Sequence, residues 1–487
     1  MDKEFYTVSD KIIFGTSWNP CGTPGEVLDG EVFFRILRDF LLNIEQNEVA
    51  HYREIVRIFD VMPYTVENIT NFFKKVLKSD FVELEKNREK LQNFSFLMEW
   101  FIWDLYNFWR GHERYLIVSD DDKVSLIEKF DKIEKIILDL YRELRTQLLG
   151  EKICVFRQVD AGVVIGVSVC KQNIFTDYRE LSDIQMISSV VFRPPVFLNN
   201  KNSTVLTDFT ETNENPLDNL KINSNEWLLL PIKILDKVVF IYFHIDFISN
   251  GLTLSNIFKV VSKDEIGDKK PDITLIYGAK DGEKNTVSSY YRDTKNNIII
   301  GYLNRVDDTD CFTYIKRMVL VAFGVKILEE DSLPFRGMLL NLTFKNDKTY
   351  NILMVGDSDS GKFELSQTLN TYLKKYIKEW KIVFNDIGFI RSEGNKCKVY
   401  NIERGIFIKL SALSGKGNFY IGLQEIIGRS IFITSDASKD YGNLINNNNI
   451  LDIINDNNDV RIATLVSTTL NTDIGYDVDI CINLLNK

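Results

Sequence analysis

The residues best suited to chemistry in this sequence run from Gly356 to Lys362 and read GDSDSGK. An apolar run, Ile352 to Val355, precedes them, and apolar residues at helical spacing follow. This order predicts a strand, a tight loop and a helix. In a GxxxxGK[ST] loop the glycines let backbone N–H groups point at phosphate oxygens, and the lysine reaches the β- and γ-phosphates. The sequence therefore predicts a site for ATP or another phosphate-bearing small molecule.

The predicted site extends along the whole loop. Its ligand-contacting residues are Gly356, Asp357, Ser358, Asp359, Ser360, Gly361, Lys362 and Phe363. The last position departs from the pattern, because Phe363 stands where a Ser or Thr hydroxyl would bind Mg²⁺ and an aromatic ring cannot ligate a metal. A glycine-rich turn that binds nothing is the alternative interpretation of the same residues.

A second acidic segment follows about twenty residues later, a spacing at which α/β nucleotide sites often place a carboxylate. The run Lys381 to Gly388 reads KIVFNDIG, which predicts a strand that ends in an acid. We expect Asp386 to present its carboxylate to a nucleotide-bound metal. Asn385, beside it, is a weaker metal candidate.

Composition narrows the classes of function. The chain has 487 residues, of which 45% are hydrophobic and 26% charged, as in ordinary globular proteins. Its net charge of −10 argues against a nucleic-acid partner, because phosphate-backbone affinity needs clustered Lys and Arg. Only 3 histidines and 6 well-separated cysteines are present, so zinc sites and disulfide frameworks are not expected, and the cysteines are expected to be buried thiols. Because no signal peptide or bilayer-spanning segment is visible, we expect a cytoplasmic protein without a membrane partner.

The predicted fold class is a multidomain α+β or α/β protein. Residues 1–150 are expected to be helical, 151–345 to form a mixed, β-rich middle domain, and 346–487 to form a nucleotide-binding domain. Helices are predicted over Gly30–Asn47, Val66–Lys78 and Ser119–Leu149, with the N-cap at Ser119 or Asp120. The helical region is also a candidate surface for a protein partner.

An aromatic cluster occupies the helical region between residues 100 and 109. Its members are Trp100, Phe101, Trp103, Tyr106, Phe108 and Trp109. Core packing is the favoured interpretation, because aromatic residues at helical spacing dominate core burial, and a ligand-binding box is the alternative.

From residue 152 the apolar period changes to two. Trp227–Ile248 predicts a hairpin that turns at Leu235–Lys237, and strands are expected at Ile273–Tyr277 and Ile298–Tyr302. The polar span Leu198–Glu226 is predicted to be a long surface loop. Before it, Arg193 either positions an anionic substrate or lies at a proline-fixed strand exit, which is the simpler account.

These motifs occur in the same order in one family. The chain resembles the ATP-dependent phosphoenolpyruvate carboxykinase superfamily, most closely the bacterial carboxykinase-like proteins that carry an extra helical N-terminal region. The family's GDSGAGKSE loop is similar to Gly356–Glu364, and its FDDMG strand to Phe384–Gly388. Its YxKKM, LPIHG, NxEGGCYAK and NARVV motifs resemble Tyr314–Met318, Leu333–Gly337, Asn401–Lys409 and Asp459–Ile462. The resemblance extends more loosely to the rest of the chain.

The resemblance implies a nucleotide held between two α/β-type lobes. In that family Mg²⁺ and Mn²⁺ assist phosphoryl transfer between ATP and the enolate formed by decarboxylation of oxaloacetate. Carried over by motif, the catalytic residues are Lys316, Arg336, Lys362 and Arg461, and Glu403 joins the nucleotide-binding residues. The family's chains continue beyond the strand that matches Arg461, so the nucleotide-binding domain is expected to be truncated.

Several metal and phosphate positions depart from the family. Arg317 and Arg336 stand where a lysine and a histidine bind Mn²⁺, and a guanidinium has no lone pair to donate. Asn385 removes one charge of the acidic pair, and Asp359 places a carboxylate where a glycine approaches phosphate. Mn²⁺ is therefore not expected to bind, and Mg²⁺ has lost its hydroxyl ligand at Phe363.

Three functions remain open from the sequence. The first is an active carboxykinase or related phosphotransferase. The second is a relative that has lost catalysis but binds a nucleotide or anion, and the number of changed positions favours it. The third is a protein-serine kinase of the HPr-kinase type, whose loop also places a glutamate where Glu364 stands.

Overall fold

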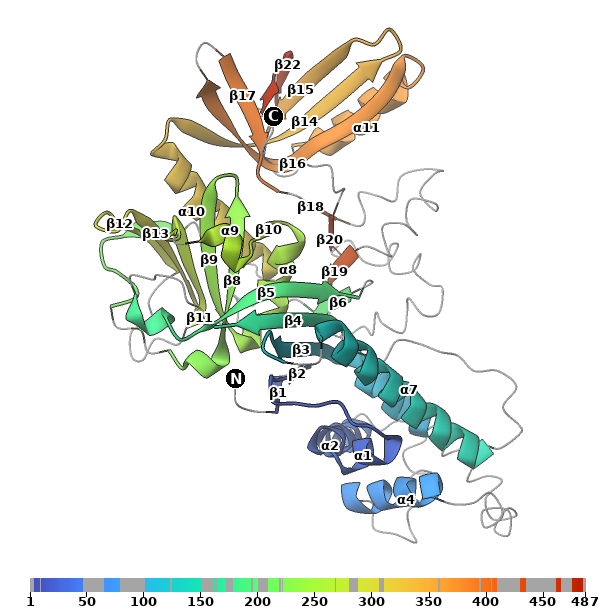
Figure 1. The fold of residues 1–487 in the computed structure, drawn as a ribbon. Helices are drawn as coiled ribbons and strands as arrows, with labels where there is room; N and C mark the ends of the chain where they lie inside the picture. Colours follow the sequence, from blue (N-terminus) through green and yellow to red (C-terminus); the bar gives the residue numbers. More distant parts are fainter. Residues whose placement is uncertain are drawn as a thin grey trace. The chain divides into compact units, whose positions relative to one another are not determined.

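The structure is a computed structural model in which two compact units can be described. The described residues are 4–8, 10–46, 65–78, 101–122, 125–149, 162, 164–171, 178–193, 196–199, 209–218, 220, 222–267, 269–279, 288–305, 311–357, 360–393, 396–403, 405–409, 430–434, 461–465 and 475–484. They form a mixed α/β fold with large sheets, in agreement with the predicted class. Figure 1 traces their elements along the sequence. The first unit takes in residues 1–168 and 191–193, and the second takes in nearly all of the rest. The predicted boundaries at residues 150 and 345 stay predictions.

Three strands of the first unit correct the expectation of a helical N-terminal region. β1 (Phe5–Val8) is antiparallel to β2 (Lys11–Phe14), and β2 is parallel to β3 (Glu113–Ser119). All residues of β2 and all but the last of β3 are buried. Strands covered on both faces lack the alternation of polar and apolar residues that reveals a strand in a sequence.

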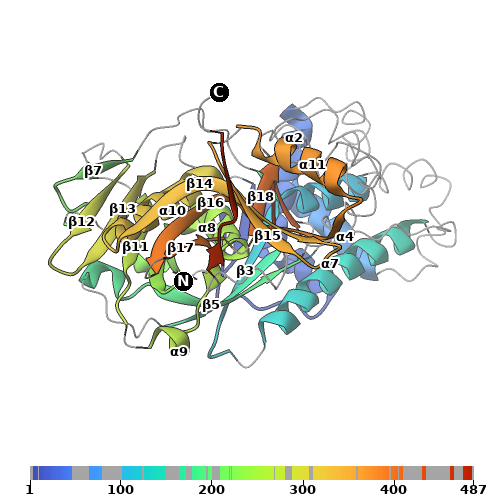
Figure 2. The same cartoon turned by 90° about the horizontal axis from the view of Figure 1, so that it is seen from above.

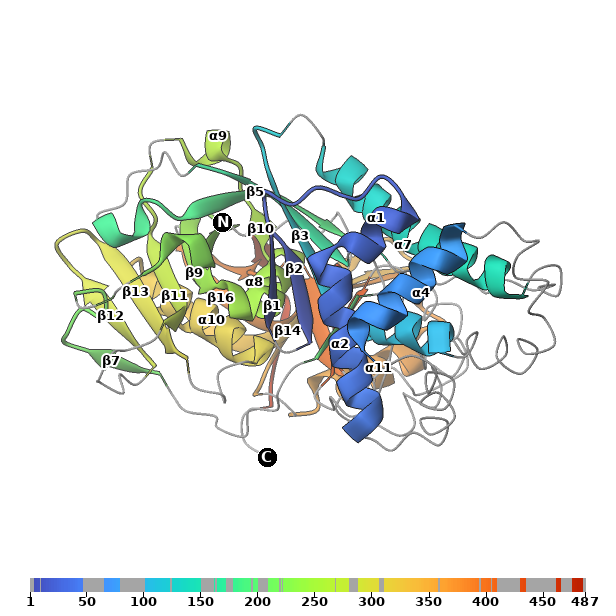
Figure 3. The same ribbon diagram turned by 90° about the horizontal axis from the view of Figure 1, so that it is seen from below.

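Helices lie in the described chain between β2 and β3, since a parallel pair needs a long crossover connection. Among the described residues these are α1 (Pro24–Asp29), α2 (Glu31–Gln46), α4 (Val66–Lys78) and a helical stretch at residues 101–111, and α7 (Leu126–Leu149) follows β3. Figure 3 shows α1, α2, α4 and α7 grouped together. The predicted ranges of α2 and α4 are confirmed, because their apolar residues face the core.

The predicted start of α7 is wrong. The chain is still in β3 at Ser119, whose hydroxyl accepts from the amide of Asp121 at 3.3 Å in the turn that follows. The helix begins at Leu126, and Ser125 caps it by accepting from the Glu128 amide at 3.2 Å. Both serines can cap a helix, and the preceding strand decides between them.

Arg193 belongs to the first unit and has a structural role. Its guanidinium pairs with Asp131 at 2.8 Å and with Glu134, both on α7. It also lies 4.5 Å from the centre of the Phe130 ring. These contacts support the strand-exit interpretation over that of a substrate-positioning arginine.

The aromatic cluster of residues 100–109 contributes to the core of the first unit. Phe101, Tyr106 and Trp109 are buried, as predicted for core packing. Tyr106 stacks on Tyr141 of α7, with ring centres 4.2 Å apart and planes 16° from parallel. Trp100 lies outside the described residues.

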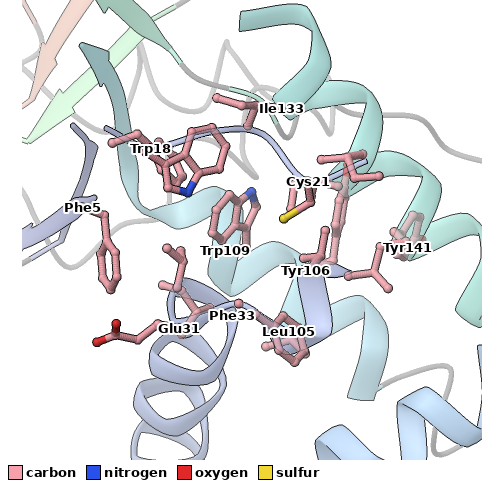
Figure 4. Close-up of a pocket in the computed structure, with 18 of the residues that line it drawn as sticks. Phe5, Trp18, Cys21, Glu31, Phe33, Leu105, Tyr106, Trp109, Ile133 and Tyr141 are labelled. Carbon is pink, nitrogen blue, oxygen red and sulfur yellow. The ribbon is translucent and has the colours of Figure 1, made fainter. Parts of the chain in front are cut away.

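This core also contains a cavity of about 300 Å³, drawn in Figure 4. It opens to solvent on one side, where the exposed Glu4 and Glu31 stand at its rim.

The larger sheet of the second unit consists mainly of strands covered on both faces. In spatial order its strands are β5 (Gln185–Phe192), β8 (Trp227–Ile234), β9 (Lys237–His244), β11 (Ile273–Ala279), β13 (Ile298–Asn304), β12 (Ser289–Asp293) and β7 (Thr210–Thr212), with β10 (Lys259–Val260) beside β8. β9, β11 and β13 are parallel, and every residue of β9 and β11 is buried. The predicted hairpin is confirmed, with its turn at Leu235 and Asp236.

The expectation of one long loop over Leu198–Glu226 is wrong in part. β7 lies inside this span and pairs in parallel with β12. β6 (Val196–Asn199) enters the span as well and pairs with β19 (Ser430–Thr434). Their partners are distant in sequence, so local composition does not reveal these short strands.

A second layer of this unit contains the predicted phosphate loop. Its strands, in spatial order, are β21 (Tyr476–Asp477), β17 (Lys396–Asn401), β16 (Ile377–Glu393), β14 (Ser332–Phe344), β15 (Thr349–Val355) and β22 (Ile480–Asn483). Leu365 and Leu369 of α11 (Lys362–Leu373) pack on the buried face formed by β14 and β15. Figure 2 shows this layer from above. A further sheet has the order β18 (Gly405–Lys409), β20 (Arg461–Leu465), β19 and β6.

α10 (Phe312–Leu328) packs between two sheets of the second unit. It contacts β11 and β13 of the larger sheet and β14 of the six-stranded sheet. Most residues along it are buried, as expected for a helix that is apolar on most of its sides. Phe323 meets the ring of Phe389 of β16 edge-on at 6.2 Å.

The cysteines correct one smaller expectation. Cys397 and Cys481 are exposed, contrary to the expectation of buried thiols, because β17 and β22 lie near or at the edges of their sheet. Among the described residues, no helix is both long enough and apolar enough to cross a membrane.

His112 predicts a pH dependence of stability. Burial lowers the pKa of its imidazole, as does nearby Arg114, while a 2.8 Å hydrogen bond from Nδ1 to the Phe108 carbonyl acts in the opposite direction. The folded-state pKa thus lies below the unfolded value of about 6.5. The stabilisation is complete above about pH 6.5 and is lost as the pH falls toward the folded-state pKa.

Denaturant unfolding at about pH 7.5, 6.5 and 5.5 measures this contribution. We expect the wild type to lose more stability over this interval than His112→Gln, which cannot titrate. Equal losses in the two proteins would contradict the assignment.

Candidate functional site

The predicted loop joins β15 to α11 as a strand, a turn and a helix. Gly356 leaves β15, and its N–H donates to the Arg336 carbonyl of β14 at 3.1 Å. A Cβ at Gly356 would lie 2.4 Å from Ser360 Oγ, so only glycine permits this closure of the turn. Gly361 has φ +84° and is the N-cap of α11, a conformation that favours glycine. Both glycines of the motif are thus needed for the shape of the turn.

Lys362, the first residue of α11, folds back over this turn. Its side chain is 8% exposed, and its Nζ donates to the carbonyl oxygens of Gly356, at 2.8 Å, and Asp357. A longer contact of 3.4 Å runs to Ser360 Oγ. The ammonium group is therefore held at the mouth of the turn, next to the N-terminus of the helix.

The strand register brings three of the sequence motifs to one level of the six-stranded sheet. On one side of β14, Gly337 pairs with Val355, the residue before the loop. On the other side, Gly337 pairs with Asp386 of β16. Asp386 is in the interior of β16, which continues to Glu393, so the predicted strand end at this acid is wrong. β14 separates the acid from the loop strand, and the side chains of Asn385 and Asp386 lie outside the described part.

A buried ion pair lies at the far end of this row. β17 pairs with β16 so that Asn401 faces Gly388, and Glu403 follows two residues later. The Glu403 carboxylate lies 2.9 Å from Lys316 Nζ of α10, and both side chains are at most 5% exposed. The side-chain amide of Asn401 donates to the backbone carbonyl of Glu403 and accepts a hydrogen bond from the backbone N–H of Glu403 at 3.1 Å. These two bonds fix the backbone that presents the Glu403 carboxylate. Asn401 was not among the predicted site residues, although its place in the NxE motif signals it.

The predicted site residues are therefore only partly brought together. The loop, the backbone of Arg336 and the Asp386 position form one row, and Lys316 meets Glu403 at its end. Arg461 is in β20 of the four-stranded sheet, where it pairs with Lys409 of β18. Its side chain, that of Phe363, and Ser358 and Asp359 lie outside the described residues.

The described side chains do not fit a resident metal. The Arg336 side chain is exposed, and the guanidinium of Arg317 lies 5.9 Å from the centre of the Phe209 ring. Neither can ligate a cation. Within the described ranges, no three His, Cys, Asp or Glu side chains come together to form a metal site.

Comparison of the sequence with models of known protein families and with curated proteins gives no match.

The buried pair predicts a large effect of single substitutions. Glu403→Leu leaves the Lys316 ammonium buried without its carboxylate, which should lower the free energy of unfolding by about 3–5 kcal/mol. The double variant Lys316→Met/Glu403→Leu removes both charges and should recover most of the loss. Urea unfolding of the two single variants and the double variant measures the coupling.

An exposed pair provides the matched control. Lys378 and Asp347 lie 2.6 Å apart with side chains 61% and 75% exposed, so Asp347→Asn should cost less than about 1 kcal/mol. A loss of that small size for Glu403→Leu would show that the Lys316–Glu403 pair does not stabilise the fold.

Proposed function

We propose that the turn between β15 and α11 binds the phosphate groups of a small molecule such as ATP, and that the chain acts by binding and not by metal-dependent phosphoryl transfer. The observation that carries the proposal is the position of Lys362, which is buried over the turn at the first residue of α11. On this proposal, the six-stranded sheet and α11 belong to a carboxykinase-like nucleotide-binding domain that takes in β14 together with the predicted residues 346–487.

The N-terminus of α11 supplies hydrogen-bond donors. The first amides of a helix have no partner within the helix, and its dipole gives this end a partial positive charge. Gly361 provides no side-chain cap for these amides. The first hydrogen bond of the helix runs from the Leu365 amide to the Gly361 carbonyl at 2.9 Å. An anion at the turn would accept from the amides that precede Leu365.

Lys362 adds a full charge beside these donors. Its 3.4 Å contact with Ser360 Oγ is long for a hydrogen bond, whereas its bonds to the two loop carbonyls are short. A phosphate oxygen can therefore replace the serine contact while the bonds that close the turn remain. Charge-assisted hydrogen bonds of this kind are about twice as strong as neutral ones.

Several features favour binding over phosphoryl transfer. Transfer from ATP depends on cations that bridge and neutralise the phosphates. Arg317 and Arg336 cannot hold these cations, and Phe363 cannot supply the hydroxyl ligand of a phosphate loop. Lys316 and Glu403, carried over as catalytic and nucleotide-binding residues, instead form a buried ion pair with each other. Glu364 gives no support to the HPr-kinase alternative. It is exposed in the first turn of α11, where acidic residues are common in helices because they interact favourably with the helix dipole.

ATP binding without metal tests the proposal. At a ligand concentration of about 100 Kd, ATP in EDTA should raise the free energy of unfolding by about 2.7 kcal/mol. Lys362→Met should weaken ATP binding by roughly 10- to 100-fold, the effect of one hydrogen bond to a charged group. Isothermal titration calorimetry, with and without Mg²⁺, measures both affinities.

Lys374→Met is the matched control, because Lys374 is exposed at the C-terminal end of the same helix. It should leave ATP affinity unchanged. ATP affinity that survives in Lys362→Met, or that requires Mg²⁺, would contradict the proposal.

A turnover assay tests the loss of catalysis. We expect no phosphoenolpyruvate from oxaloacetate and ATP with the wild type in the presence of Mg²⁺ and Mn²⁺. The variant Phe363→Ser/Asn385→Asp/Arg317→Lys/Arg336→His restores the family's ligands, and turnover by this variant alone would indicate a decayed enzyme. Turnover by the wild type would overturn the proposed function.

A further inference from the structure

We propose that the cavity of the first unit binds a neutral, largely apolar small molecule about the size of a fused two- or three-ring system. The cavity lies in the core formed around α1, α2, α7 and the helical stretch at residues 101–111, all within the first unit. It is separate from the phosphate loop, which belongs to the second unit. The proposal does not depend on the function proposed above.

The size of the cavity sets the size of the ligand. Its volume is about 300 Å³. An apolar cavity of about 150 Å³ in another protein stays dry and binds benzene. A cavity twice that size accommodates a fused-ring molecule or an aliphatic molecule of similar bulk. Because the cavity opens to solvent on one side, a ligand displaces water from mostly apolar walls, which favours its binding.

The walls favour a flat ligand. Trp18, Trp109 and Phe33 lie around the cavity together with Tyr106 and Tyr141, as Figure 4 shows. Trp18 and Phe14 already contact each other with ring centres 4.3 Å apart. Aromatic rings gain from offset and edge-to-face contacts with another ring beyond the area that they bury. Aliphatic side chains complete the lining: Ile36, Leu105, Ile133 and Leu140, among others.

The charges at the cavity exclude an anion and disfavour a cation. Among the described residues, Glu4 and Glu31 are the acidic side chains that line it, and no Lys or Arg does. Both glutamates are exposed, so they lie at the rim and repel a negative ligand. A cation deep in the apolar interior would lose its hydration without a buried carboxylate to pair with. A neutral ligand meets neither penalty.

Cys21 offers a local reporter. It lines the cavity and is partly buried, and burial raises the pKa of its thiol, as does the negative charge of Glu26 on α1. A bound ligand should cover this thiol and slow its alkylation. Cys397 of the second unit is exposed and serves as an internal control.

The experiment uses the full-length chain and the neutral fluorescent probe N-phenyl-1-naphthylamine. We expect saturable probe binding to the wild type, with slower iodoacetamide alkylation of Cys21 and unchanged alkylation of Cys397, measured by peptide mass spectrometry. Absence of saturable binding, or binding that leaves Cys21 alkylation unchanged, would overturn the proposal.

A space-filling variant tests whether the probe binds in the cavity. Ile36→Phe adds a ring at a lining position of α2 and should weaken probe binding by about tenfold or more without lowering the melting temperature. The matched control is Ile69→Phe, because Ile69 of α4 is fully buried and does not line the cavity. It should lower the melting temperature by overpacking and leave probe affinity unchanged. Unchanged affinity in Ile36→Phe would overturn the proposal, and the Cys21 measurement on the wild type stands if that variant does not fold.

Discussion

The register of β14 against its two neighbours decides which residues meet beside the phosphate loop. β14 pairs with β15 on one side and β16 on the other, so that Val355, Gly337 and Asp386 share one level. A shift of one residue would turn every side chain of β14 to the opposite face. It would also move the Arg336 carbonyl away from the Gly356 N–H that it binds. Buried residues on both faces of β14 oppose such a shift.

Within this register, the turn and the expected metal positions differ in the groups that they offer a ligand. The turn combines a left-handed Gly361, a helix N-terminus and the ammonium of Lys362 over the loop, features that suit an anion. The positions that would hold cations carry arginine or phenylalanine. On the proposed function, such a site binds phosphate through hydrogen bonds and charge and lacks the groups that stabilise a transferring phosphoryl group.

Local patterns predicted the elements that depend on local sequence. The hairpin at Leu235, helix α4 and the turn before Lys362 follow from turn residues, apolar period and glycine placement. The sequence could not reveal β2, whose two covered faces erase the strand period, nor the start of α7, where Ser119 and Ser125 are equally good caps. The meeting of Lys316 with Glu403 depends on α10 packing against the six-stranded sheet. Motif order placed both residues in one site, but only tertiary structure pairs them.

Hydrogen–deuterium exchange of the full chain with ATP in EDTA reports whether the turn before Lys362 binds phosphate. We expect ATP to slow exchange in peptides covering residues 350–373, because the amides at the turn and the start of α11 become donors to phosphate. Peptides of β9 and β11, buried in the larger sheet, should not change. Saturating ATP that leaves residues 350–373 unprotected, or that protects another part of the chain instead, would show that the turn is not the binding site.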